Sequence, residues 1–170
     1  MGARNKRHGK DTGKGVEIMA ESSISSSSSQ VELSVAYQIE AAVVDALKYS
    51  VSAVSASQIR QVLDLSGEYK DGAGVVVSVS DLGAYNGNSV LKQTQTVVTC
   101  YTHLDADLNG DLLRSLASQA FSVLTNMTYT LQGWQVALPA GYGNYSISAQ
   151  GTDGSYRQLT LTATQHLFKS

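Results

Sequence analysis

The residues with the most suggestive chemical spacing form a short acidic run near the middle of the chain. Its oxygen-bearing side chains stand at alternate positions and are followed by a glycine and one more acid: Asp105, Asp107, Asn109, Gly110 and Asp111. A calcium-binding EF-hand loop needs oxygen ligands at positions 1, 3 and 5, a glycine at position 6 and a bidentate glutamate at position 12. Counted from Asp105, that last position is Leu116. The run therefore lacks the ligand that closes a calcium cage. A weak cation site of another kind, at Asp105, Asp107, Asn109 and Asp111, is kept only as an alternative.

The same run is better explained as the start of a helix. After this run in the sequence, apolar residues recur at the spacing of a helix that is buried on one side. They are Leu112, Leu113, Leu116, Ala117, Ala120, Phe121 and Leu124. Asp and Asn are favoured at helix starts because their side-chain oxygens accept hydrogen bonds from otherwise unpaired backbone N–H groups. We therefore predict a helix over 107–126 whose buried face is led by Leu112, Leu116 and Phe121, and a cluster that holds no metal.

The other reactive side chains do not combine into a recognisable catalytic or cofactor site. None of the three histidines, His8, His103 and His166, stands at metal-ligand spacing from another histidine or from the single Cys100. His103 and Asp105 have the types of a general base and its orienting carboxylate, but no nucleophile motif such as G-x-S-x-G accompanies them. Cys100 lies in a β-like run and is expected to be a buried thiol. We predict no catalytic residue and no cofactor.

Charge divides the chain of 170 residues into two parts. Residues 1–30 carry a net charge of +2 and are rich in Gly, Ser and basic residues, whereas residues 31–170 carry a net charge of −4. Such a leader has little to bury and is predicted to be a flexible arm. Its apolar run Val16–Ala20, with Ile24, has the composition to add a short strand to a neighbouring chain. No apolar run approaches the roughly 18 residues that span a bilayer, so no membrane partner is expected.

Residues 31–170 are predicted to form a single α+β domain, and this domain must position the acidic run. Helical spacing predicts a first helix over 31–49. Alternating and β-branched residues predict strands at 58–65, 75–79, 90–102, 134–138, 145–149 and 159–163. Turn residues at 86–88 and 153–154 separate neighbouring strands. We expect a mostly antiparallel sheet of about six strands with two helices packed on one face, plus an extended N-terminal arm.

The composition of the chain favours assembly with other proteins. Only 15% of its residues are charged, against about 25% in typical globular proteins. Its nine tyrosines outnumber two phenylalanines and one tryptophan, and tyrosine is enriched at interfaces because it combines an apolar ring with a polar tip. Such a surface suits packing against many neighbours better than electrostatic capture of a ligand.

Taken together, these elements resemble those of the tail terminator proteins of tailed bacteriophages, also called tail-completion or minor tail proteins. The resemblance covers residues 33–168. It rests on the helix Val31 to Tyr49, the strand Gly74 to Val79, the acidic run that opens the second helix, and the final segments Trp134 to Pro139 and Asp153 to Thr164. The longer basic, serine-rich leader departs from that pattern.

The resemblance implies a structural virion protein without enzymatic activity. Its copies are expected to form a ring, commonly a hexamer, which caps the finished tail tube, joins it to the head-tail connector and is assembled in the host cytoplasm. DNA would pass through the ring without sequence-specific recognition. A head-tail connector (stopper) and a tail-tube protein are alternatives. From another class, a small cation-dependent binding module or hydrolase would use the run from Asp105 to Asp111.

Overall fold

The computed structural model describes residues 34–62, 72–87, 89–128, 130–136 and 146–170, with the backbone alone for 146–153. All of them belong to the unit Glu32–Ser170. The predicted arm over 1–30, including Val16–Ala20, lies outside the described residues. The same holds for the ends of two predicted strands, at 63–65 and 137–138.

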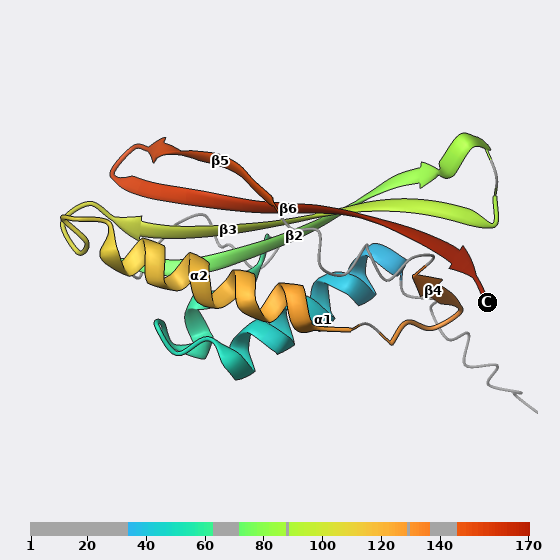
Figure 1. Ribbon diagram of the computed structural model, residues 1–170, viewed down its shortest axis with the longest axis horizontal. Coiled ribbons are helices and arrows are strands. Elements are labelled where there is room, and N and C mark those ends of the chain that lie inside the picture. The colour runs from blue at the N-terminus through green and yellow to red at the C-terminus, as the bar shows by residue number, and fades with distance from the viewer. Residues whose placement is uncertain (1–33, 63–71, 88, 129, 137–145) are drawn as a thin grey trace, which may run out of the picture. The chain divides into compact units, whose positions relative to one another are not determined.

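A twisted sheet forms the framework of this unit (Figure 1). Its continuous path joins five strands in the order β1-β2-β3-β6-β4. These are β1 (Ile59–Gln61), β2 (Ala73–Ala84), β3 (Leu91–His103), β6 (Tyr156–Lys169) and β4 (Trp134–Val136). A further strand, β5 (Ser146–Asp153), pairs with β6 outside this path. The long strands β2, β3 and β6 are paired along most of their length and form the centre of the sheet.

The sheet differs from the predicted one in strand direction. The expectation was a mostly antiparallel sheet of about six strands. The sheet is instead mixed, because β1 pairs in parallel with β2 through Ile59, Arg60 and Gln61. Its continuous path has five strands. A periodic pattern shows which residues share a face and says nothing about the direction of the partner strand. The fold class is α+β, as predicted.

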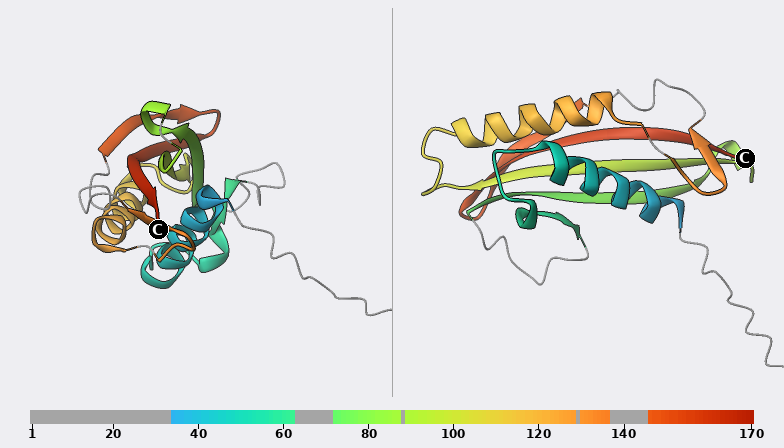
Figure 2. Two further views of the ribbon diagram at one scale, coloured as in Figure 1. Left: turned by 90° about the vertical axis from the view of Figure 1, so that its right-hand side faces the viewer. Right: turned by 90° about the horizontal axis from the view of Figure 1, so that it is seen from below.

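Two helices cover one face of this sheet (Figure 2). Helix α1 (Val35–Ser50) begins at Ser34, whose hydroxyl accepts a hydrogen bond from the N–H of Tyr37 at 3.3 Å. Its buried residues recur at helical spacing, as predicted: Val35, Ala36, Ile39, Glu40, Val43, Val44 and Leu47. α1 packs on β1 and β2, whereas α2 (Asp111–Asn126) packs on β3 and β6. The two helices therefore divide the sheet between them.

Helix α2 begins four residues later than the predicted 107–126 and buries a narrower stripe than predicted. Its buried residues are Leu113, Leu116, Ala117, Ala120 and Leu124. Phe121 was predicted to lead the buried face, and this is wrong, because its side chain is 40% exposed. At 3.6 residues per turn, Leu112 and Phe121 lie on opposite flanks of the stripe, each about 90° from its centre. A helical period defines a broad apolar arc, and only the partner surface decides which part of it is covered.

The turns between the long strands follow the predicted residues. Asn86 has a φ of 50°, in the left-handed region that Asn tolerates better than most side chains. Gly154, between β5 and β6, has a φ of 57°. Asn88, the third residue of the first predicted turn, lies outside the described residues.

The core lies between the sheet and the two helices. It includes Val75 and Val77 of β2, Val98 and Cys100 of β3, and Leu161 of β6, all fully buried or nearly so. Burial raises the pKa of the Cys100 thiol to about 12, so the thiol is not ionised at neutral pH. This confirms the prediction of a buried cysteine.

One glycine is required by close packing within the sheet. Gly74 of β2 is paired with Tyr101 of β3, whose side chain is almost fully buried. A Cβ atom on Gly74 would lie only 2.6 Å from Cζ of Tyr101 and 2.6 Å from the carbonyl oxygen of Gln58. Position 74 therefore accepts no side chain, because the tyrosine ring occupies that space.

Two buried polar side chains support the sheet beyond its apolar centre. Gln165 of β6 accepts hydrogen bonds through Oε1 from the hydroxyls of Thr94 at 3.3 Å and Thr96 at 3.1 Å. Glu40 of α1 accepts a hydrogen bond from the backbone N–H of Val79 at 3.1 Å, just past the point where β1 stops pairing with β2. Each contact joins elements that are distant in sequence.

We predict that Leu116→Ala lowers the free energy of unfolding by about 2–5 kcal/mol, because it opens a cavity in the core. Phe121→Ala should cost less, below about 2 kcal/mol, because the partly exposed ring has fewer contacts to lose. Urea denaturation of the two variants measures the difference. A larger loss for Phe121→Ala than for Leu116→Ala would contradict the position of α2.

Candidate functional site

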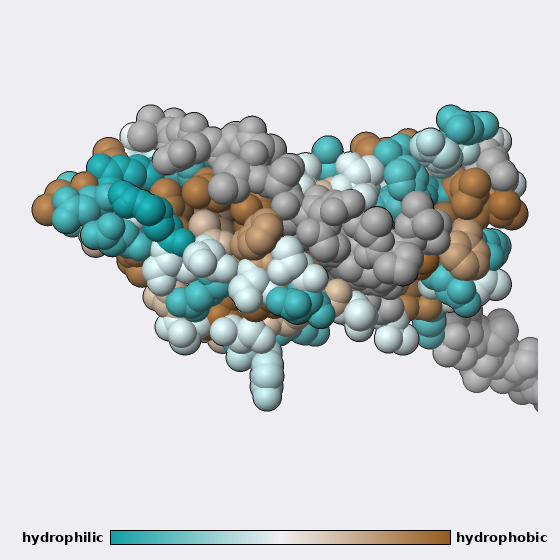
Figure 3. Space-filling view, in the orientation of Figure 1, coloured by the Kyte–Doolittle hydropathy of each residue, from teal (hydrophilic) through white to brown (hydrophobic). Residues whose placement is uncertain are grey.

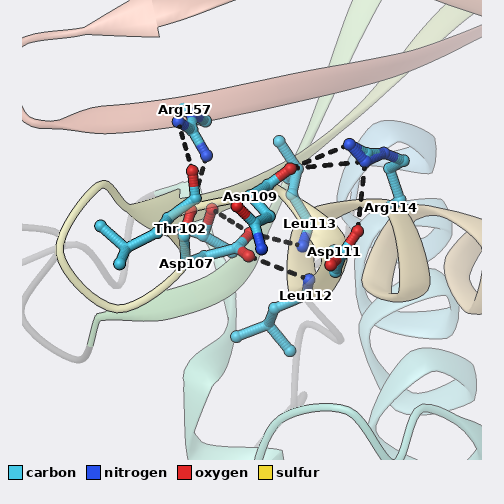
Figure 4. Close-up of polar contacts among 9 residues, drawn as sticks. Thr102, Asp107, Asn109, Asp111, Leu112, Leu113, Arg114 and Arg157 are labelled. Atoms are coloured by element: carbon cyan, nitrogen blue, oxygen red, sulfur yellow. Dashed lines mark hydrogen bonds and ion pairs between the residues drawn. The ribbon is translucent and has the colours of Figure 1, made fainter.

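The acidic run forms the junction between β3 and α2 (Figure 4). Asp107 is buried there, with 6% of its surface exposed. Its Oδ1 accepts a hydrogen bond from the N–H of Leu112 at 3.1 Å, and its Oδ2 accepts one from the N–H of Leu113 at 2.9 Å. Oδ2 also accepts a hydrogen bond from the hydroxyl of Thr102 at 3.1 Å. Both carboxylate oxygens thus bind the start of the helix or the end of the strand before it.

This arrangement makes Asp107 the capping group of α2 from outside the helix. The residue at the N-cap position is Gly110, which has a φ of 74° and no side chain to offer. The first N–H groups of a helix need acceptors, and a carboxylate there also complements the helix dipole. The acidic run therefore precedes a helix, as predicted. The capping role that was predicted for the whole cluster belongs to Asp107.

The other three proposed cation ligands make separate contacts. The side chain of Asp105 is 92% exposed, and its Oδ2 lies 3.7 Å from Nδ1 of His103. The guanidinium of Arg114 donates to the carbonyl oxygen of Asn109 at 2.9 Å and to Oδ1 of Asp111 at 3.3 Å. Over the residues that the structure describes, no group of three or more His, Cys, Asp and Glu side chains gathers as a metal site would require.

An arginine from the last strand fixes the loop before α2. Arg157 of β6 donates to the carbonyl oxygens of Asp107 at 2.5 Å and Leu108 at 3.0 Å. Arg157 is the strand partner of Thr102, which binds the carboxylate of Asp107. Sequence reasoning missed both residues, because neither belongs to a local motif and Arg157 is 50 positions from Asp107. The one sequence signal for Arg157 was its position as a basic residue beside the predicted turn at 153–154.

The same contacts set the ionisation of Asp107. Burial alone would raise the pKa of its carboxyl, because a charge loses hydration there. The hydrogen bonds from the N–H groups of Leu113 and Leu112, the hydroxyl of Thr102 and the N–H of Asp111 outweigh burial and lower the pKa below its ordinary value. The carboxylate is therefore charged at neutral pH, and these hydrogen-bond donors stabilise its charge.

The two described histidines contact aromatic rings. His103 lies edge-on to Tyr156 with ring centroids 5.0 Å apart, and His166 lies edge-on to Tyr85 at 4.8 Å. His8 lies outside the described residues. His103 and Asp105 meet through the 3.7 Å contact given above and through a hydrogen bond that the backbone N–H of Asp105 donates to Nδ1 of His103 at 3.2 Å. No nucleophile was identified in the sequence to complete this pair.

A groove lies on the β6 side of α2. It has a volume of about 320 Å³ and is lined by Arg114, Ala117, Ser118, Phe121, Leu159 and Leu161. Figure 3 shows hydrophobic residues gathered along this side of the molecule. Small-molecule sites usually place several convergent polar groups in such a space, whereas the described lining offers Arg114 and one hydroxyl. The groove is suited to an apolar side chain.

Comparisons with known proteins add no family. No protein-family model matches the chain, and no curated protein matches it significantly. Neither α1 nor α2 has the length and hydrophobicity needed to cross a bilayer, and the same is true of every helix among the described residues.

We predict that Asp107→Asn lowers the free energy of unfolding at neutral pH by about 1–3 kcal/mol, because a buried hydrogen-bonded carboxylate is replaced by a weaker acceptor. The native pKa of Asp107 lies below the unfolded value of about 3.9. The contribution of the charge is therefore fully present above about pH 4 and is lost as the pH falls through the native pKa. Urea denaturation at several pH values should show the two proteins converging in acid.

Asp105→Asn is the matched control for this measurement, because the exposed carboxylate of Asp105 makes no comparable contact with the start of α2. Its free energy of unfolding should stay close to that of the parent protein across the same pH range. A difference between Asp107→Asn and the parent protein that does not change with pH would show that the charge of Asp107 is unimportant.

We also predict that the acidic run binds calcium no more tightly than about 10 μM, the range of calcium sensor sites. The reason is that Asp107 already uses both oxygens for backbone and hydroxyl donors, and Leu116 is buried where the closing glutamate would stand. Calorimetric titration with calcium checks this. Calcium binding that is tighter than this and disappears in Asp107→Asn would support the alternative of a cation-dependent binding module or hydrolase.

Proposed function

We propose that this protein is a structural subunit of a phage particle, a tail terminator that forms a closed ring at the head-proximal end of the tail. The observation that carries the proposal is the character of one sheet face. The face of β2, β3 and β6 that points away from α1 and α2 is called here the outer face. Among the described residues no helix covers it (Figure 2), and hydroxyl and amide side chains predominate along its middle.

The outer face follows from the strand register. Partners across the sheet share a face, and successive residues alternate. Because Val77, Val98 and Leu161 face the helices, the intervening residues form the outer face. Most of its central members are polar: Ser78, Ser80, Gln93, Gln95, Val97, Thr99, Gln158, Thr160, Thr162 and Thr164. Val76 and Tyr101 lie on the same face and are buried. Along the described length of these three strands it includes no Asp, Glu, Lys or Arg, and its histidines, His103 and His166, stand near its two ends.

The charged residues of the same strands lie on the other face. Lys92 is paired with Leu167, and Arg157 with Thr102, whose side chains are buried on the helix side. Contact with nucleic-acid phosphates depends on Lys and Arg, so the outer face does not suit DNA. It suits another protein surface, because burying uncharged polar groups avoids the large desolvation cost of ions.

Large exposed apolar side chains add further contact points on other sides of the molecule. Tyr49 at the end of α1 is 93% exposed and Leu108 before α2 is 76% exposed. A subunit that touches several neighbours needs such points on more than one side, and exposed aromatic residues are typical of interfaces. The chain would thus contact copies of itself, the tail tube and the head-tail connector, with DNA passing through the ring.

The nearest alternatives, a connector (stopper) and a tail-tube protein, differ in how copies associate. A terminator or connector forms one closed ring, which requires a head-to-tail interface whose rotation closes, and therefore cyclic symmetry. A tube protein stacks many rings along an axis. The alternatives are thus separable by the size and symmetry of the assembly.

We predict that the purified protein forms one cyclic oligomer of defined mass, expected to be a hexamer, as measured by native mass spectrometry and checked by electron microscopy. Particles that lack the protein should yield unjoined heads and tails, with many tails of abnormal length. Stacked rings along the tail would support the tube protein instead. Normal joining without the protein would contradict any role at the head-tail junction.

A further inference from the structure

We propose that the groove beside α2 receives the last turn of α1 from a second copy of this chain, with Tyr49 as the inserted side chain and Asp45 as its charged neighbour. The inference rests on the proposed ring and names the contact that would close it. The α1 ridge, as we call Asp45 and Tyr49, lies on one helix and the groove on the other.

The groove offers an apolar surface with one charge. Leu159 and Leu161 of β6 are buried beneath it, and Phe121 leaves 40% of its surface exposed beside them. Arg114 lines the groove with its side chain 64% exposed, and its guanidinium also contacts Oδ1 of Asp111 at 3.3 Å and the carbonyl oxygen of Asn109 at 2.9 Å. A partner should therefore bring an apolar side chain and a negative charge, spaced to reach both features.

The α1 ridge brings both of these features. Tyr49 is the most exposed of the large hydrophobic residues described, at 93%. Asp45 is also exposed and precedes it by four residues, so the two side chains are neighbours on one face of the helix. A single exposed turn of α1 thus presents a large aromatic ring beside a carboxylate.

The two surfaces match in chemistry. The tyrosine ring can bury against Phe121 and the leucines, and aromatic rings bury about 150–250 Å² each. Arg114 can pair with Asp45 through its fork of donors and stack against the tyrosine ring. Tyrosine and arginine are also the residue types that most often dominate binding energy at interfaces.

The placement of the two surfaces favours a ring over a two-fold dimer. α1 lies over β1 and β2, whereas the groove opens where α2 meets β6, so ridge and groove belong to different helices of the layer that Figure 2 shows. When the two halves of a contact are different patches of one subunit, the interface is head-to-tail. Such an interface forms a ring if its rotation closes.

A charge exchange in the full-length protein tests the pairing. Asp45→Arg and Arg114→Glu should each cause loss of the assembled species in native mass spectrometry, because like charges meet at the contact. The double variant should restore the assembly, since the pair is re-formed in reverse. Melting temperatures close to that of the parent protein confirm that each exposed substitution leaves the fold intact.

Removal of the aromatic ring is the second measurement. Tyr49→Ser should abolish assembly, whereas Tyr37→Ser should not. Tyr37 is the matched control because it has the same residue type, lies on the same helix and is 44% exposed, about 18 Å away along the helix axis. Equal effects of the two substitutions would show a general loss of surface hydrophobicity and would overturn the specific role of Tyr49.

Disulfide trapping identifies the contact directly. Tyr49→Cys protein mixed with Ser118→Cys protein should form a crosslinked pair under oxidation, while the buried Cys100 stays unreactive. Crosslinking requires Cα atoms within about 7 Å. A ring that persists in both charge variants and forms no such crosslink would overturn this interface while leaving the proposed function standing. A parent protein that stays monomeric at every concentration would overturn both.

Discussion

The carboxylate of Asp107 joins the end of β3 to the start of α2. It accepts hydrogen bonds from the first turn of α2 and from Thr102 at the end of β3, while Arg157 of β6 binds the backbone of the same loop. The position of α2 over β3 and β6 depends on these contacts, since the helix has no side-chain cap of its own at Gly110. The burial of Leu116 and the shape of the neighbouring groove follow from that position.

Much of the fold is visible in the sequence, because helical and strand periodicity are local properties. α1, α2 and the long strands β2, β3 and β6 overlap their predicted ranges, and Cys100 is buried as expected. The direction of β1 and the exposure of Phe121 were not predictable, because each depends on a partner surface distant in the chain. The same limit applies to Arg157, whose role depends on its register opposite Thr102.

The candidate site shows how one sequence pattern can serve two chemistries. Alternating acids followed by glycine are typical of both a calcium loop and a helix start. Here the decisive residues lie outside the pattern, since Leu116 belongs to the core and Thr102 supplies a hydroxyl donor. Counting ligands excluded an EF-hand, but only the fold assigns the cap to Asp107 rather than to Asp111 or Asn109.

The outer face has a consequence for the response of an assembly to ionic strength. Salt screens interactions between charges over a Debye length of about 8–10 Å near physiological conditions, and it leaves hydroxyl and amide contacts largely unaffected. An interface built on Thr160, Thr162 and Thr164 would therefore tolerate large changes in salt, whereas a contact between Asp45 and Arg114 would weaken. A particle that uses both kinds of surface would retain its neutral contacts while its charged ones loosen, so its dissociation in salt would proceed in separable steps.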